Sequence, residues 1–281
     1  MNLIKGTTNP NPAQYFQDAL AAADPYVDFS PYDVVYVIPP ANNGNITYGP
    51  SFPMSTNAPL LKTNEKVFMN GAVAGADSRD QQNSLEWVWM AHETGHLFGL
   101  EHPYLDQNGA QGQSQGVTAS VGVWDLMMSM QKWNVLQPRE FLAWTRFLIG
   151  WFNDAQIGCI DPTLHSSFST TKLISPLERQ DQGLKALIVK LSNTKALVVE
   201  VRRNEGFDSI PQSAEGVLVY RVDVTKLSNQ GMATIITDNP TLSEGMMIGT
   251  MHPGSSITDS GVTVKVIDSG AAGDTVNIQI N

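Results

Sequence analysis

Cysteine is nearly absent from this chain: Cys159 is the only one among 281 residues. A single cysteine excludes an intramolecular disulfide framework, so the fold must be stabilised by packing, together with any metal ions that it binds. A lone cysteine is far more often a small buried apolar residue than a catalytic one. We therefore expect Cys159 to be buried.

Long apolar runs and basic side chains are also scarce. No run approaches the ~20 apolar residues of a membrane span, and the polar start at residues 1–5 does not resemble a secretory signal. The 17 lysines and arginines are outnumbered by 27 aspartates and glutamates, which gives a net charge of −10. This charge disfavours nucleic acid and anionic membranes as partners. With 42% hydrophobic residues, the composition is that of an ordinary globular protein.

The most informative feature present is the run at residues 92–102, His-Glu-Thr-Gly-His-Leu-Phe-Gly-Leu-Glu-His. His92 and His96 are four residues apart, so on a helix their side chains lie on one face and can reach one metal ion. Glu93 is not needed as a ligand and can take a proton from metal-bound water. Gly99 accepts the left-handed conformation that ends a helix. The resulting turn can bring His102 to the metal as a third ligand.

This set of residues has the form of a catalytic zinc site. Three protein ligands leave the fourth tetrahedral position open for water or substrate. A chance histidine pair on a buried helix is the plain alternative, but the full pattern uses three of the five histidines in the chain. A site that binds zinc without catalysing is the second alternative. Glu93 argues against it, because a structural site has no use for a carboxylate there.

The run fits H-E-x-x-H-x-x-G-x-x-H, and in this the chain resembles the metzincin zinc metalloproteases. Metzincins are named for a methionine-containing turn downstream of the third ligand, where the methionine packs beneath the ligands without binding the metal. Met127, within Val-Trp-Asp-Leu-Met-Met-Ser at residues 123–129, resembles that turn. Met128 is the alternative, and an ordinary core methionine is the other interpretation. Further segments resemble the immune inhibitor A-like family of secreted bacterial metzincins: residues 27–33, 141–152, 199–208 and 216–223.

The resemblance implies a zinc endopeptidase that is secreted and acts on protein or peptide substrates. It implies one catalytic Zn²⁺ held by His92, His96 and His102, with Glu93 as the general base. Members of the immune inhibitor A-like family commonly carry an acidic residue where His102 stands. This chain departs from them there, toward the three-histidine pattern of other metzincins.

The order of patterns along the chain predicts an α+β protein. Residues 1–157 are expected to form a metzincin-type catalytic domain with a twisted mixed sheet, an active-site helix and a Met-turn. Residues 158–281 are expected to form an all-β, sandwich-like domain, because glycine, serine and asparagine punctuate short apolar or alternating runs there. Among the first elements we expect a helix at 11–24, a buried strand at 33–38, a glycine-interrupted strand at 67–77, the active-site helix from 84, and a helix from 138 with a buried aromatic stripe reaching 152.

The sequence leaves four points open. The strand at 67–77 either lines the rim of a substrate cleft or is an ordinary edge strand. Asp106, in a polar loop at 103–122, begins an Asp-Gln-Asn-Gly run that could bind Ca²⁺, although a turn is the simpler interpretation. The alternatives to an endopeptidase are a binding protein with a vestigial zinc site and an enzyme that acts on small peptides or amides. The sequence gives no indication of the oligomeric state.

Overall fold

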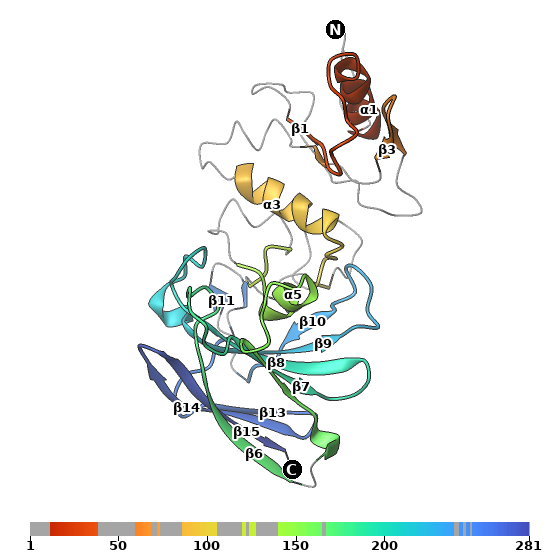
Figure 1. Cartoon of the computed structure of the whole chain (residues 1–281). Coiled ribbons are helices and arrows are strands. Elements are labelled where there is room, and N and C mark those ends of the chain that lie inside the picture. The colour runs from red at the N-terminus through yellow and green to blue at the C-terminus, as the bar shows by residue number, and fades with distance from the viewer. Residues whose placement is uncertain are drawn as a thin grey trace. The chain divides into compact units, whose positions relative to one another are not determined.

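The computed structural model describes residues 12–38, 60–68, 72–73, 86–105, 120–121, 124–127, 140–164, 167–238, 242–243, 246–247 and 249–280. The protein is α+β, as predicted, with mixed sheets and few helices in the described part (Figure 1). It divides into two compact units, Met1–Leu100 and Glu101–Asn281. These units do not coincide with the domains expected at 1–157 and 158–281, and that assignment stays a prediction.

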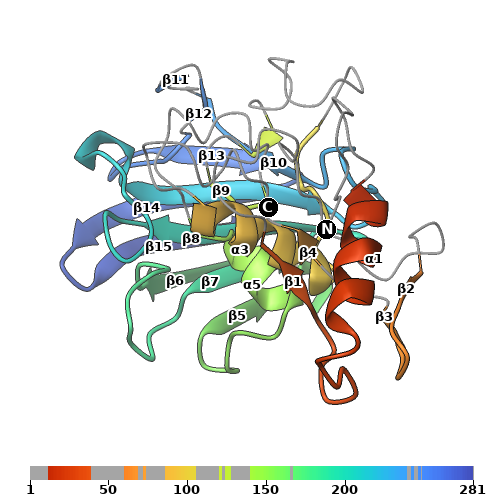
Figure 2. The same cartoon turned by 90° about the horizontal axis from the view of Figure 1, so that it is seen from above.

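The first unit contains helix α1 (Pro12–Ala23), as predicted, next to a hairpin of β2 (Leu61–Lys62) and β3 (Val67–Phe68) (Figure 2). Gln17 joins the helix to the hairpin, because its amide donates to the Lys62 carbonyl at 2.9 Å and accepts from the Lys62 N–H at 2.8 Å. Apolar side chains from the helix, the segment after it and the hairpin form one core: Tyr15, Phe16, Leu20, Phe29, Leu61 and Phe68.

The strand predicted at 33–38 is shorter than expected. Strand β1 (Tyr36–Val37) pairs in parallel with β4 (Ala72–Val73). The residues at 33–38 are exposed or half-buried, so the prediction of a buried strand was wrong. An apolar run is buried only where another layer covers it, and the run itself does not show whether such a layer exists. Residues 69–71 and 74–77 lie outside the described residues, so the role of the strand expected at 67–77 stays open. Helix α3 (Glu86–Leu97) agrees with the predicted active-site helix.

The second unit is built on two sheets. The mixed five-stranded sheet has the order β10 (Ala233–Ile235), β9 (Gly216–Asp223), β8 (Lys195–Arg202), β7 (Ala186–Lys190), β5 (Ile157–Ile160), with only β5 and β7 parallel. The antiparallel four-stranded sheet has the order β13 (Ser256–Asp259), β14 (Val262–Gly270), β15 (Gly273–Ile280), β6 (Phe168–Ile174). The smaller elements are the pair β11 (Leu242–Ser243) and β12 (Met246–Met247) and the 3₁₀ turns Pro162–Leu164 and Gln212–Ala214.

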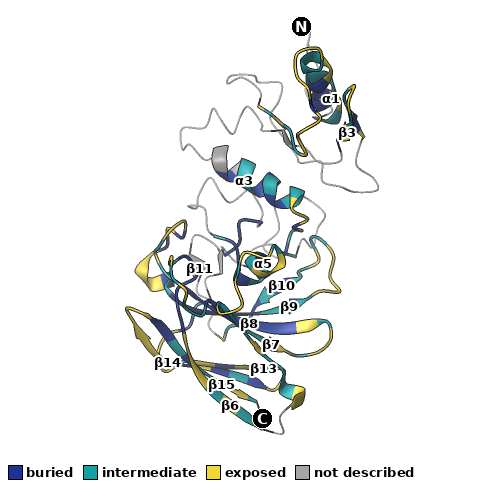
Figure 3. Ribbon diagram, viewed as in Figure 1, coloured by how far each residue is buried: buried dark blue, intermediate teal, exposed yellow. Residues whose placement is uncertain are grey.

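These two sheets pack face to face as a sandwich (Figure 1). Valine, leucine and isoleucine side chains from both sheets share one core, and β8 is buried along nearly its whole length (Figure 3). The second face of the five-stranded sheet is covered in turn by Trp124, Leu142 and Ala143, which belong to the segments before β5. The unit therefore has a central sheet buried on both faces.

The helix predicted from Pro138 to residue 152 is shorter in the structure, where α5 spans Ala143–Leu148. Pro138 itself lies outside the described residues. Phe141 is buried, but Trp151 is 55% exposed, so the aromatic stripe is core only in part. The helix ends at Leu148, and Gly150 forms the turn just after it with a φ of +72°, so residues beyond that turn no longer follow the helical period. The expectation that Cys159 is buried was also wrong, since it is exposed on β5, at the edge of its sheet.

Candidate metal centre

Helix α3 carries the first two predicted ligands on one face. His92 is fully buried and His96 is half-buried, and their rings lie edge to face with centroids 4.9 Å apart. Thr94, between them in the sequence, donates from its hydroxyl to the Met90 carbonyl at 2.6 Å and accepts from the Tyr36 hydroxyl at 2.6 Å. This second bond ties the helix to the segment that contains β1. The i, i+4 spacing thus places both imidazoles on one side of the helix, as predicted.

The helix ends at Leu97, and the predicted glycine turn follows it at Gly99, whose φ is +82°. Its N–H donates to the His96 carbonyl at 2.9 Å, and the Leu100 N–H donates to the Gly95 carbonyl at 3.0 Å. This pair of bonds is the Schellman arrangement, which requires a left-handed residue and therefore favours glycine. The chain consequently reverses between His96 and His102.

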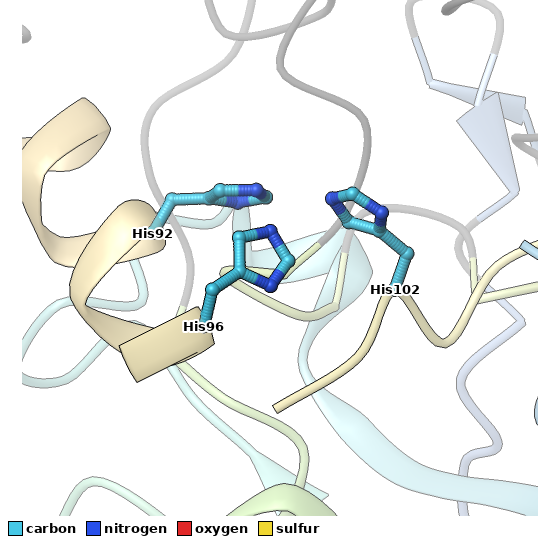
Figure 4. A group of neighbouring side chains, drawn as sticks. All are labelled: His92, His96 and His102. Carbon is cyan, nitrogen blue, oxygen red and sulfur yellow. The ribbon is translucent and has the colours of Figure 1, made fainter. Parts of the chain in front are cut away.

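The reversal brings the third predicted ligand to the other two. One possible ligand atom from each of His92, His96 and His102 lies within 4.8 Å of the others. Figure 4 shows the three rings pointing toward one another, two from the helix and one from the segment that follows it. Three imidazole nitrogens are a donor set that suits zinc and several other divalent transition metals. The residues present therefore fit a bound metal ion.

One of the predicted ligands, His96, has its tautomer set by a backbone group. His96 Nδ1 lies 2.7 Å from the carbonyl oxygen of buried Leu100. A carbonyl only accepts, so Nδ1 carries the proton and Nε2 keeps its lone pair. Metal-binding histidines are usually held in this way, because the hydrogen bond fixes the ring orientation as well as the tautomer.

Glu93, the predicted general base, lies one residue after His92 and is only 3% exposed. A buried carboxyl costs free energy unless its surroundings compensate, so such a group on the helix that carries two predicted ligands is an unusual feature.

The run at residues 106–109, considered as a possible Ca²⁺ site, lies outside the described residues.

Met127 is fully buried in a turn, and Met128 lies outside the described residues. The turn is organised by Asp125, whose Oδ1 accepts from the Met127 N–H at 2.7 Å. Its Oδ2 accepts from the Leu142 N–H at 2.8 Å and from the Thr145 hydroxyl at 2.7 Å. Burial raises the pKa of Asp125 to about 6, although these hydrogen bonds favour the ionised form. The placement of Met127 beneath the ligands stays a prediction.

A buried arginine connects this turn to the five-stranded sheet. The Arg202 guanidinium lies 5.0 Å from the centre of the Trp124 ring and donates to the Phe141 carbonyl at 3.1 Å. It also pairs with Glu200 at 2.9 Å and with Asp208 at 2.6 Å. No motif in the sequence singles out Asp125, Glu200 or Arg202. Polar residues at alternate positions of a strand normally indicate a face exposed to solvent.

Comparisons with known proteins identify no relative: no family model, no curated protein and no solved structure matches this chain. Among the described residues, no helix combines the length and the apolar character needed to cross a membrane.

Proposed function

We propose that this protein is a zinc-dependent endopeptidase with a metzincin-like site. The observation that carries the proposal is the convergence of His92, His96 and His102 within 4.8 Å, on and just after a helix that also holds buried Glu93. The three histidines supply the ligands of a catalytic zinc site, and three protein ligands leave one tetrahedral position open. The proposal includes the family-based expectations that Met127 packs beneath the ligands and that the protein is secreted.

The chemistry proposed is hydrolysis of a peptide bond by water. A bound zinc ion supplies a Lewis acid, which lowers the pKa of a water molecule to about 7 and polarises the carbonyl that is attacked. His92, His96 and His102 would hold the metal as neutral imidazoles. Glu93 accepts the proton that the attacking water loses and then donates it to the leaving nitrogen, so that a carboxylic acid and an amine are released.

The test is proteolysis of unfolded casein by the metal-loaded full chain, with and without a chelator. Glu93→Gln should keep zinc at one ion per chain and lose turnover by a factor of about 10²–10⁴, because it removes the general base. Glu101→Gln is the matched control, since Glu101 is exposed and lies just before the third ligand. It should cleave casein at the wild-type rate.

Each other outcome has a distinct meaning. Turnover retained by Glu93→Gln would reject the general-base role. Zinc bound without cleavage of any peptide would favour a binding protein. Cleavage of short peptides alone would favour an enzyme of small peptides or amides, which a peptide-library digest would identify by the bond cut.

A further inference from the structure

The segment that carries His102 is held by the connection between β9 and β10. Two N–H groups of this connection and the N–H of the first residue of β10 donate to three successive carbonyls of the segment: Asn229 to His102 at 3.2 Å, Gly231 to Tyr104 at 2.9 Å, and Ala233 to Pro103 at 3.1 Å. A β-bridge between Leu105 and Gln230 continues the contact. The third predicted ligand is thus fixed by a part of the chain more than a hundred residues away in sequence.

Ser228 lies at the start of this contact and faces His102 itself. The serine Oγ accepts from the backbone N–H of His102 at 3.3 Å and lies 3.5 Å from its ring atom Nδ1. Figure 4 shows one ring nitrogen of His102 facing the other two histidines, with the second nitrogen on the far side of the ring. The serine oxygen therefore lies on the side of the ring away from the candidate metal position.

The same arrangement supports His96, where the Leu100 carbonyl oxygen lies 2.7 Å from Nδ1. A neutral imidazole that binds a metal through Nε2 carries its proton on Nδ1, and an oxygen acceptor at Nδ1 fixes both tautomer and orientation. We propose that Ser228 is a positioning residue for the metal ligand His102, and that the β9–β10 connection is part of the metal centre. This inference rests on the metal binding in the proposed function.

The backbone around Ser228 is built to keep it in place. Asn229 and Gly231 have φ values of +63° and +72°, in the left-handed region. A Cβ atom added to Gly231 would lie 3.2 Å from Cβ of Leu105, so the β9–β10 connection and the ligand segment approach each other closely at this glycine. The Gln230 N–H closes the turn by donating to the Leu227 carbonyl at 3.0 Å. Two left-handed residues and a close approach leave the connection little freedom relative to the ligand segment.

The test measures the zinc dissociation constant of the full chain by competition with a chromophoric chelator. Ser228→Ala should weaken zinc binding by about 10–100-fold, the usual effect of removing a partner of a metal-bound histidine. Ser228→Thr keeps the hydroxyl and should restore affinity to within about threefold of wild type. Ser192→Ala is the matched control: its Oγ accepts from the Thr194 N–H at 3.2 Å, in another hairpin of the same unit, and it should bind zinc as wild type does.

Two further measurements separate positioning from plain stability. The unfolding midpoint of the metal-free protein should change equally little in Ser228→Ala and Ser192→Ala, whereas the absorption spectrum of bound Co²⁺ should change only in Ser228→Ala. The ring ¹⁵N spectrum of zinc-bound wild type needs no variant. It should show the His102 Nδ1 protonated and its hydrogen protected from exchange.

The outcomes distinguish this inference from the proposed function. Unchanged affinity in Ser228→Ala, an equal loss in Ser192→Ala, or zinc bound at Nδ1 of His102 would overturn the role of Ser228 and leave the peptidase proposal standing. Zinc affinity that depends on Ser228 without any proteolysis would support the inference and reject the peptidase. A wild-type chain that binds no zinc would overturn both.

Discussion

Arg202 and Asp208 form a bidentate pair that is closed to solvent. The guanidinium donates from Nε to Oδ2 and from Nη2 to Oδ1 of Asp208, both at 2.6 Å, and neither residue is more than 1% exposed. Burial alone lowers the pKa of an arginine, but the charges of Asp208 and Glu200 hold the pKa of Arg202 above its ordinary value. Arg202 therefore stays ionised, and its two bonds to Asp208 fix the guanidinium against Trp124 and the turn that contains Met127.

Removing this arginine should be costly. Arg202→Met leaves two buried carboxylates without their cation, and we expect the free energy of unfolding to fall by about 3–5 kcal/mol. Urea denaturation monitored by tryptophan fluorescence measures the change. Arg221→Met is the matched control, because Arg221 is 37% exposed and pairs with Asp259 at 2.9 Å. The free energy of unfolding of Arg221→Met should fall by only about 0–1 kcal/mol. Equal losses in the two variants would show that the buried pair has no special role.

Replacing Asp125 should also lower the free energy of unfolding. Asp125→Asn keeps the shape of the side chain but points an NH₂ group at donors of Met127, Leu142 or Thr145, which leaves buried donors unsatisfied. We expect a loss of about 1–3 kcal/mol in the free energy of unfolding. Asp161→Asn is the control, because Asp161 accepts from the N–H and hydroxyl of Thr163 in an exposed turn. Its free energy of unfolding should fall much less than that of Asp125→Asn, since water can replace the bonds that Asp161 makes.

The convergence of the three histidines was predictable from sequence because it is local. His92, His96 and His102 span eleven residues, and helix periodicity with a glycine turn is enough to bring them together. Ser228 is 126 residues from His102, and no periodicity connects them. Its position follows from the pairing of the β9–β10 connection with the ligand segment, which only the folded chain shows.

The fold shows the same division between local and long-range information. Helix α1 and the alternating strands were predictable, because capping residues and side-chain periodicity lie within each segment. Glu200 and Arg202 had the pattern of a solvent-facing strand, yet segments before β5 cover that face of β8. Cys159 was expected in a core but lies at a sheet edge. In both cases burial depends on which layer covers a strand, and the strand does not encode that layer.

Gly99 should matter to the metal site beyond its effect on stability. Gly99→Ala forces a side chain into the left-handed region, and a Cβ atom there would meet nothing within 4 Å. The cost is therefore backbone strain of about 1–2 kcal/mol. Relaxing that strain displaces the turn between His96 and His102, so we expect zinc affinity to fall by about tenfold.

Gly150→Ala is a matched control for Gly99→Ala. Gly150 has a φ of +72° and equally open space, but it follows α5. The free energy of unfolding of Gly150→Ala should fall by a similar amount, while its zinc affinity should stay at the wild-type value. Urea denaturation of the metal-free protein and chelator competition measure the two effects separately. A fall in zinc affinity in both variants would mean that the affinity reports global stability.

Glu178 should make the protein less stable as the pH rises through neutrality. Burial and the nearby charge of Glu140 raise the pKa of Glu178 from 4.5 to about 7, although Arg146 and the Phe207 N–H favour the ionised form. A group whose pKa is higher in the folded protein stabilises it fully below the unfolded pKa. That stabilisation is lost as the pH rises through the folded pKa. Each pKa unit by which the folded value exceeds the unfolded value changes the free energy of unfolding by at most about 1.4 kcal/mol.

Glu178→Gln removes this titration and keeps an oxygen that can accept from the Phe207 N–H. Its free energy of unfolding should therefore rise relative to wild type between about pH 5 and about pH 8. Asp161→Asn is the control. The hydrogen bond from Lys190 and those from Thr163 lower the pKa of Asp161 to about 2, so its contribution is complete above its unfolded value of 3.8. Its difference from wild type should stay constant over this pH range. Urea denaturation at both pH values measures the slopes, and a constant difference for Glu178→Gln would contradict the raised pKa.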